Sequence, residues 1–319
     1  MHRFQRSLLV LLAGFVGACA TTAGEAPARP TAMASDSARM GSIYCLSIEG
    51  SEAQHFITGS VHFPLFFKLD VAPHILALVE RSDVLLLEAT LPPIREEVVE
   101  SERLRKTLGE LNPPISDKVL ELIDQHLGQD RRMSRQAWMR LNPVAINQGL
   151  EGQIRFPSPR GVSLDAQFVR AARLGGNDID GIELMKEQVL IVNRIPTEQW
   201  EKIFQDQITA IGNEPRREQL LASLRDQYRT IHDAQWNQFD AVVRSQDHYL
   251  SMLTMAVSAG RSQVLTDRIV ARLKADQRSH FIALGAAHMG GEQGVLASLR
   301  AQGVSLEKNC QAAGISATK

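Results

Sequence analysis

A repeated strand-like unit that ends in Gly-x-x-His constrains this chain more than any other feature. The first copy is HFITGSVH, from His55 to His62, and the second is HFIALGAAH, from His280 to His288. A glycine at the end of a strand lets the backbone turn sharply, and small residues leave room for a ligand beside the imidazole. Two such units predict that His62 and His288 face one cleft, whereas His55 and His280, which precede the strands, are expected to be exposed.

Each unit continues into a helix-like stretch and a second apolar run that carries a carboxylate, Glu88 in the first copy and Glu307 in the second. Helix and strand patterns alternate only at the two ends of the chain, and residues 197–259 have the pattern of long amphipathic helices. The sequence therefore predicts an α/β (α+β) fold with a mixed central sheet, made of two similar halves with a helical insertion between them.

Periodicity and turn residues give the expected element boundaries. A polar turn at 49–52 joins the first two strands, and a helical pattern from 94 to 139 is interrupted at 112–114. Strands are predicted at 43–48, 55–59, 85–87, 281–284 and 304–307, and helices at 71–82, 163–174, 263–275 and 291–302.

Residues 1–19 have the pattern of a secretory signal. A basic start is followed by an apolar stretch, Leu8–Val16, that is too short to span a bilayer, and then by small residues before Cys19. This order resembles a bacterial lipobox and predicts a periplasmic lipoprotein held at the membrane by a lipid on Cys19. A plain signal peptide cleaved after Ala18 or Ala20 is the alternative.

The rest of the chain divides into a tether and a folded domain. Residues 20–40 are rich in Ala, Thr, Ser and Pro and are expected to form a flexible tether. Residues 41–319, in a chain with 44% hydrophobic residues, can bury a substantial core and are expected to form the domain. A net charge of −1 without a basic block gives no support to nucleic-acid binding. Oligomeric state is not indicated.

Two cysteines remain in the predicted domain, Cys45 in the first strand and Cys310 just beyond the last. If these strands are neighbours, a disulfide would tie the ends of the domain together and stabilise it by about 3–4 kcal/mol. Two separate thiols are the alternative, because sequence does not show whether the Cα atoms come within bridging distance.

Five segments of the chain match one known protein family, and they come in that family's order. They are Gly59-Ser60-Val61-His62, the strand ending in Glu88, Gly161-Val162-Ser163-Leu164-Asp165, Gly181-Ile182-Glu183 with Gln188, and Gly285-Ala286-Ala287-His288-Met289-Gly290-Gly291 leading into Gly294-Val295-Leu296. In these segments the chain resembles the TraB/PrgY/GumN family, which includes the TIKI metalloproteases and sits in a wider erythromycin-esterase-like superfamily. One departure is Arg261-Ser262, where the family usually has Arg-Asn. The resemblance implies metal-dependent hydrolysis of a peptide or protein.

Imidazole and carboxylate are ordinary ligands of a catalytic divalent metal, with Zn, Mn or Co plausible here. His62, His288 and either Glu88 or Glu183 would leave one coordination position open for water, and the remaining carboxylate could act as general base. Without a metal, a histidine oriented by a glutamate could take a proton from water.

Each candidate also has a structural interpretation. Glu88 could be a buried carboxylate paired with Arg261 or Arg268, Glu183 could begin a helix, and Arg261 could be an ion-pair partner or an anion clamp. Ser60 is a weak nucleophile candidate, because its hydroxyl could equally bond the backbone.

Other classes of site and function are also to be weighed. The sequence contains no His-Glu-x-x-His, Gly-x-Ser-x-Gly or phosphate-loop motif. The alternatives to a hydrolase are an accessory lipoprotein of envelope or polysaccharide assembly and a haem or metal carrier.

Overall fold

The computed structural model describes most of the region predicted to fold. His62, Cys310 and the predicted signal lie outside the described residues, as do parts of the predicted helical region at 94–139. Among the described residues, no helix combines the length and apolar character needed to cross a membrane. The described residues are 38–40, 43–61, 69–90, 115–127, 143–154, 162–192, 194–232, 235–258 and 260–309.

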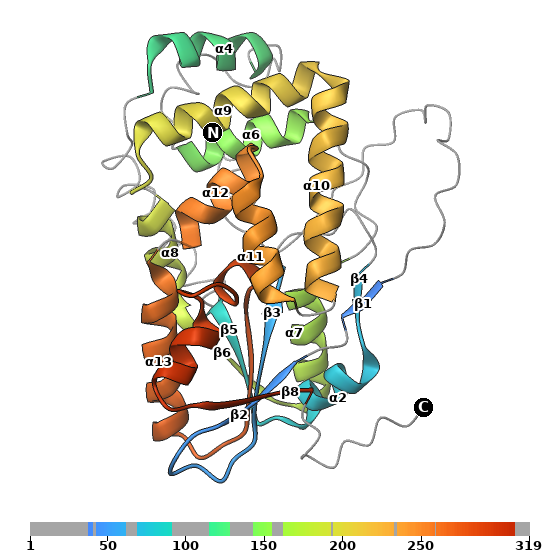
Figure 1. Cartoon of the computed structure of the whole chain (residues 1–319), viewed down its shortest axis with the longest axis vertical. Coiled ribbons are helices and arrows are strands. Elements are labelled where there is room, and N and C mark those ends of the chain that lie inside the picture. The colour runs from blue at the N-terminus through green and yellow to red at the C-terminus, as the bar shows by residue number, and fades with distance from the viewer. Residues whose placement is uncertain are drawn as a thin grey trace, which may run out of the picture.

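A six-stranded mixed sheet forms the centre of the protein (Figure 1). Its four strands β6, β5, β7 and β3 run parallel to one another, while β2 is antiparallel to both β3 and β8. The predicted α/β class with a mixed sheet is confirmed. In spatial order the strands are β6 (Asp178–Leu184), β5 (Val84–Thr90), β7 (His280–Gly285), β3 (His55–Ser60), β2 (Tyr44–Ser47) and β8 (Ser305–Lys308).

The two repeated units lie side by side at the middle of the sheet. Strands β3 and β7 pair in register from His55 opposite His280 to Ser60 opposite Gly285, and every residue of both strands is buried. Parallel strands covered on both faces carry apolar runs, which explains the apolar residues that follow the first histidine of each unit. The register brings the two glycine turns to the same edge of the sheet.

Helices cover both faces of the sheet. In Figure 1, α13 (Arg261–Ala275) and α7 (Leu164–Gly175) lie on opposite sides of it. Ser163 caps the start of α7 by accepting from the backbone N–H of Ala166, and Gly176, in the left-handed conformation, ends it. Helix α2 (Pro73–Arg81) packs on α7, and α14 (Val295–Ala301) packs on α13.

A second group of helices extends from one end of the sheet (Figure 1). It has its own core, in which Trp200, Phe204 and Tyr249 are almost fully buried. Helices α11 and α12 contact the short 3₁₀ helix η1 (Ala286–His288) that follows β7. The group therefore covers the edge at which the parallel strands end. Its members are α4 (Asp117–Leu127), α6 (Pro143–Gln153), α8 (Met185–Val192), α9 (Thr197–Gly212), α10 (Glu214–His232), α11 (Trp236–Ser245) and α12 (Tyr249–Ser258).

The N-terminal part of the fold adds a small element that the sequence did not indicate. Strand β1 (Ala38–Met40) lies within the segment expected as a tether and pairs in parallel with β4 (Leu69–Val71). Near the other end, the helix expected over 291–302 is shorter, because α14 begins only at Val295, after the glycine-rich loop.

The two units differ in the strand that follows their histidine. Strand β5 lies inside the sheet and carries Glu88, which is buried, whereas β8 is the far edge strand, where Glu307 is exposed. Strand β8 pairs with β2, so the first and last strands of the sheet are neighbours, and Cys45 is disulfide-bonded. Cys310 lies outside the described residues, so its pairing with Cys45 stays a prediction.

The expected exposure of His55 and His280 is wrong. Both side chains are completely buried at the start of their strands, and their rings lie 5.3 Å apart between centroids. The parallel register sets them against each other, and the turns before each strand cover them.

Candidate functional site

Three neighbouring parallel strands bring candidate residues to one edge of the sheet. Glu88 lies near the end of β5, Glu183 near the end of β6, and Gly285 is the last residue of β7. The pairing of β5 with both β6 and β7 sets these positions at the same level. In open α/β sheets, the crevice beyond the carboxyl ends of the strands is the usual place for a ligand.

Arg261 joins the two carboxylates. It is the first residue of α13, and its Nη2 donates to Glu88 Oε1 at 2.8 Å and also to Glu183 Oε2. All three side chains are about 5% exposed or less. Burial opposes protonation of the guanidinium, but the neighbouring Glu88 and Glu183 raise the pKa of Arg261 above its usual value. Arg261 is therefore a fixed positive charge between two buried carboxylates.

Glu88 receives hydrogen bonds from several directions. The backbone N–H of Gly285 donates to its Oε2 at 2.8 Å, and Gln188 Nε2 donates to its Oε1 at 3.0 Å. Together with Arg261, these contacts supply the compensation that a buried carboxylate requires. Gln188 lies on α8, five residues after Glu183, and this spacing places Glu183 and Gln188 beside the same group, formed by Glu88 and Arg261.

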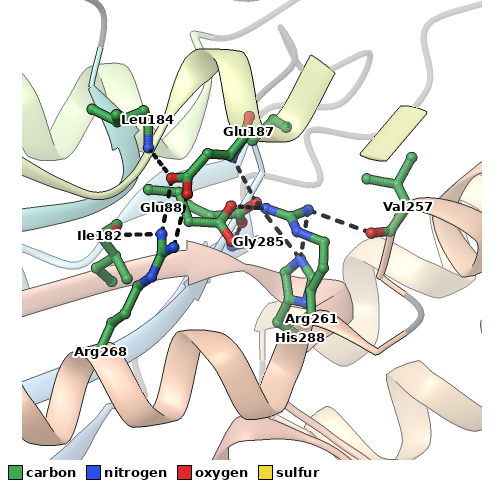
Figure 2. Close-up of polar contacts among 11 residues, drawn as sticks. Glu88, Ile182, Leu184, Glu187, Val257, Arg261, Arg268, Gly285 and His288 are labelled. Carbon is green, nitrogen blue, oxygen red and sulfur yellow. Dashed lines mark hydrogen bonds and ion pairs between the residues drawn. The ribbon is translucent and has the colours of Figure 1, made fainter. Parts of the chain in front are cut away.

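His288 completes the group, which we call the Glu-Arg-His cluster (Glu88, Glu183, Arg261 and His288). Its Nε2 lies 3.3 Å from Arg261 Nη1 and 3.6 Å from Glu88 Oε1, as Figure 2 shows. An unprotonated Nε2 can accept from Arg261, and a protonated Nε2 faces the Glu88 carboxylate. The second ring nitrogen, Nδ1, is buried and has no hydrogen-bond partner within the described ranges.

A second ion pair fixes the turn between β6 and α8. Arg268, two turns after Arg261 on α13, makes two hydrogen bonds of 2.8 and 2.9 Å to the carboxylate of Glu187 (Figure 2). Glu187 also accepts from the backbone N–H of Leu184, and Arg268 donates to the carbonyl of Ile182. Helix α13 therefore holds the segment that carries Glu183 on both sides of that residue.

The glycines of the motif permit close packing around the cluster. A Cβ at Gly59 would lie only 2.5 Å from Cη2 of Trp236, the first residue of α11. A Cβ at Gly290, two residues after His288, would lie only 2.0 Å from the backbone carbonyl oxygen of Trp236. A side chain at either position would push α11 away from the sheet edge, so the glycines are needed for contact as well as for the turn.

The structure brings together four of the five residues that the sequence singled out. Glu88, Glu183, Arg261 and His288 converge, whereas His62 lies outside the described residues. Of the two arginines considered as partners of Glu88, Arg261 fills that role. No role for Gln188 was predicted from the sequence, although its spacing of five residues from Glu183 could have indicated that the two lie close together.

Ser60 and Asp165 form a separate contact. The Ser60 hydroxyl donates to the carboxylate of Asp165, in the first turn of α7, and Ser60 is almost completely buried. This contact gives Ser60 a structural partner, and no histidine is among the partners of its hydroxyl in the described part of the chain.

Sheet and cluster together define an α/β protein in which charged and imidazole side chains meet beyond the carboxyl ends of parallel strands. The chain belongs to the TraB/PrgY/gumN family, whose model matches residues 45–308. No curated protein and no solved structure gives a significant match.

Proposed function

We propose that this protein is a hydrolase that cleaves an amide bond in a peptide or protein, with water activated by a divalent metal ion. The observation that supports the proposal is the buried Glu-Arg-His cluster at the strand ends. Burial of several charged groups in one place is costly and concentrates at functional sites. Membership of a family that includes metalloproteases is consistent with this activity.

His288 fits the role of a metal ligand. Its Nδ1 is buried without a partner, while its Nε2 lies 3.6 Å from Glu88. Metal-bound histidines commonly turn their second ring nitrogen toward a carboxylate, which fixes the ring. In this arrangement Nδ1 would hold the ion, and Nε2 would carry its proton toward Glu88, which would orient the ring. Arg261 Nη1 would then donate to the carbonyl of Val257 and not to Nε2. Glu88 as a direct ligand stays a prediction, and would have to exchange hydrogen bonds that it makes here.

The donor set needs a further residue. Within the described ranges, no group of three or more His, Cys, Asp or Glu residues has an arrangement that could hold a metal ion. The proposal therefore depends on His62, which the first Gly-x-x-His unit carries just beyond Val61. A bound Zn, Mn or Co ion would lower the pKa of water and polarise the scissile carbonyl.

The other cluster residues have distinct roles in the proposal. Arg261 holds both carboxylates in place through Nη2, and its Nη1, which donates to the carbonyl of Val257, lies 3.3 Å from His288 Nε2. Among the described residues, Glu183 accepts a hydrogen bond from the Arg261 side chain, whereas Glu88 accepts from Arg261, Gln188 and the backbone of Gly285. Glu183 is thus the carboxylate less occupied by donors, and we assign it as the general base.

Peptide cleavage by the purified chain tests the proposal. A peptide library is incubated with the protein before and after chelation, with Zn, Mn or Co added back, and bound metal is measured by mass spectrometry. We expect cleavage that needs metal and falls at least about 100-fold in His62→Ala and in His288→Ala. The matched control is His74→Ala, on an exposed position of α2.

The outcomes separate the alternatives. Metal or haem bound without any cleavage would favour a carrier, and neither binding nor cleavage would favour an accessory protein of the cell envelope. Either result would overturn the hydrolase proposal, provided that circular dichroism shows the protein to be folded.

The proposed location is the periplasm, with a lipid on Cys19 as the membrane attachment. It rests on the order of basic, apolar and small residues before Cys19. Metabolic labelling with a fatty acid should mark the wild-type protein and leave Cys19→Ala unlabelled. Labelling of both, or of neither, would contradict it.

A further inference from the structure

The opposite edge of the sheet, where the parallel strands begin, contains a second buried polar group. His55 begins β3 and His280 begins β7, and the register pairs them directly. Both are completely buried, with ring centroids 5.3 Å apart. Among the described residues, His55 Nδ1 and both ring nitrogens of His280 have no hydrogen-bond partner. The proposed hydrolytic function uses neither residue.

Two turns cover this pair. Ser51 is in the turn between β2 and β3, and its Oγ lies 3.2 Å from His55 Nε2. Asp276 follows α13, and its Oδ2 lies 3.5 Å from His280 Nε2. Gln277 connects the turns through a 3.5 Å hydrogen bond to the carbonyl of Gly50. The histidines therefore lie beneath the joint between two surface turns.

The charged groups around the pair do not make protonation favourable. Asp276 is the facing carboxylate, but Arg278 donates to it through three nitrogen-to-oxygen contacts of 2.8 to 3.1 Å. Arg272, on α13, adds positive charge near His280, and Asp83, before β5, adds a carboxylate that is already bonded by Ser279. The nearby carboxylates are thus largely engaged with other partners.

The pKa directions agree with this geometry. Burial, and then the neighbouring His280, lowers the pKa of His55 to about 4, against an opposing effect of Asp276. Burial also lowers the pKa of His280; Asp276 and the backbone of Arg278 oppose this effect, whereas the charges of Arg272 and Arg278 add to it. Both rings are therefore neutral at pH 7.

We propose that the His55–His280 pair is an acid-sensitive latch, which holds the two turns on the sheet while both rings are neutral and releases them when the pH falls. Two adjacent imidazolium ions in a buried site repel each other and lose their hydration. Unfolding or local opening exposes the rings to water, where they take up protons. Acid therefore favours the open state.

The direction of the pH effect follows from proton linkage. A histidine whose pKa is lower in the folded state contributes full stability above the unfolded value of 6.5, and that stability is lost as the pH falls toward the folded value. For His55, with a folded pKa of about 4, the unfolding equilibrium constant at pH 5 is about 30-fold larger than at pH 8. His280 adds to this change in the same direction.

Urea unfolding of the full chain at pH 8, 7, 6 and 5 tests the latch. We expect His55→Gln to lose about 30-fold of the change between pH 8 and pH 5, and the double variant with His280→Gln to lose more. His74→Gln is the control and should keep the wild-type pH dependence. The same change in His55→Gln as in wild type would overturn the proposal. Buried His248, whose pKa burial also lowers to about 4, adds an equal contribution to both proteins and cancels in this comparison.

Two further measurements keep the test decisive. Hydrogen exchange is measured at pH 5 and corrected for intrinsic rates. The exchange rate should increase at 48–57 and 276–283 more than in β5, and a uniform increase would contradict local release.

If His55→Gln does not fold, the imidazole NMR signals of the wild-type protein test the latch instead. The His55 ring should be neutral at pH 5, and the pKa of His280 should lie below 6.5; titration of both rings near pH 6.5 in the native protein would refute the latch. None of these results depends on hydrolytic activity.

Discussion

The two edges of the parallel sheet bury polar side chains in opposite ways. At the edge where the strands end, Glu88, Glu183 and Arg261 are buried as ions and bonded to one another. At the edge where the strands begin, His55 and His280 are buried as neutral rings with unpartnered nitrogens. The difference indicates that fixed charge is retained only where the fold offers it a counter-charge, at the edge suited to ligand binding.

The largest expected effect comes from removal of the counter-charge. Arg261→Leu leaves Glu88 and Glu183 buried without their cation, and we expect a loss of about 3–5 kcal/mol in the free energy of unfolding at pH 7. Urea unfolding measures it. Arg268→Leu breaks the half-exposed pair with Glu187 and should cost no more than about 1 kcal/mol. Equal losses of stability in the two variants would contradict the expectation that breaking the buried ion pairs costs more than breaking the half-exposed pair.

The next test concerns packing at the same edge. Gly59→Ala places a methyl group against the ring of Trp236, and we expect it to cost about 1–3 kcal/mol. Gly212→Ala, at the end of α9, meets nothing within 4 Å and should be neutral or stabilise by up to about 1 kcal/mol. Thermal unfolding of both variants compares them. A tolerated Gly59→Ala would show that α11 can move away from the strand ends.

Glu151, on α6, differs from Glu88 and Glu183 because its hydrogen-bond partner is a neutral hydroxyl group and not a cation. Burial raises its pKa to about 7, opposed by a 3.5 Å hydrogen bond from the Tyr249 hydroxyl. A raised carboxyl pKa means that stability is present below pH 4.5 and is lost as the pH rises to 7. Because the side chain retains some exposure, we expect Glu151→Gln to be about 1–2 kcal/mol more favourable relative to wild type at pH 8 than at pH 5. Urea unfolding at both pH values checks this, and no pH-dependent difference would contradict it.

The smallest effect is expected at the latch. Ser51→Ala removes the hydroxyl beside His55 and should cost about 0.5–1 kcal/mol at pH 8. The decrease in stability from pH 8 to pH 5 should stay close to that of wild type, since burial and His280 are the main causes of the lowered pKa of His55. If Ser51→Ala removed the pH dependence of stability, the hydrogen bond between Ser51 and His55 would be its cause, and not burial.

Much of the site was predictable because the relevant pattern is local. The Gly-x-x-His motif and Glu88 mark where their strands end in the sequence. The carboxyl ends of parallel strands lie at the same edge of the sheet. The convergence of Glu88, Glu183, Arg261 and His288 followed from this rule and from the family resemblance. The α/β class followed from the alternation of apolar periods.

The rest depends on contacts between distant segments. The burial of His55 and His280 requires the register of β3 against β7, and no local pattern sets a register between strands so far apart. The position of β8 beside β2, and not inside the sheet, likewise depends on tertiary pairing. The close contact of Trp236 with Gly59 was also not predictable. The sequence of α11 indicates only an amphipathic helix that covers the sheet, and not which residue it contacts.

The place of β7 in the sheet has a consequence for biosynthesis. This strand lies between β5 and β3, yet it is almost the last part of the domain to leave the ribosome. Until it arrives, the nascent polypeptide exposes two unpaired apolar strand edges, and such edges attract other chains. The strand order therefore predicts that the unfinished chain is most prone to aggregation before β7 has been made.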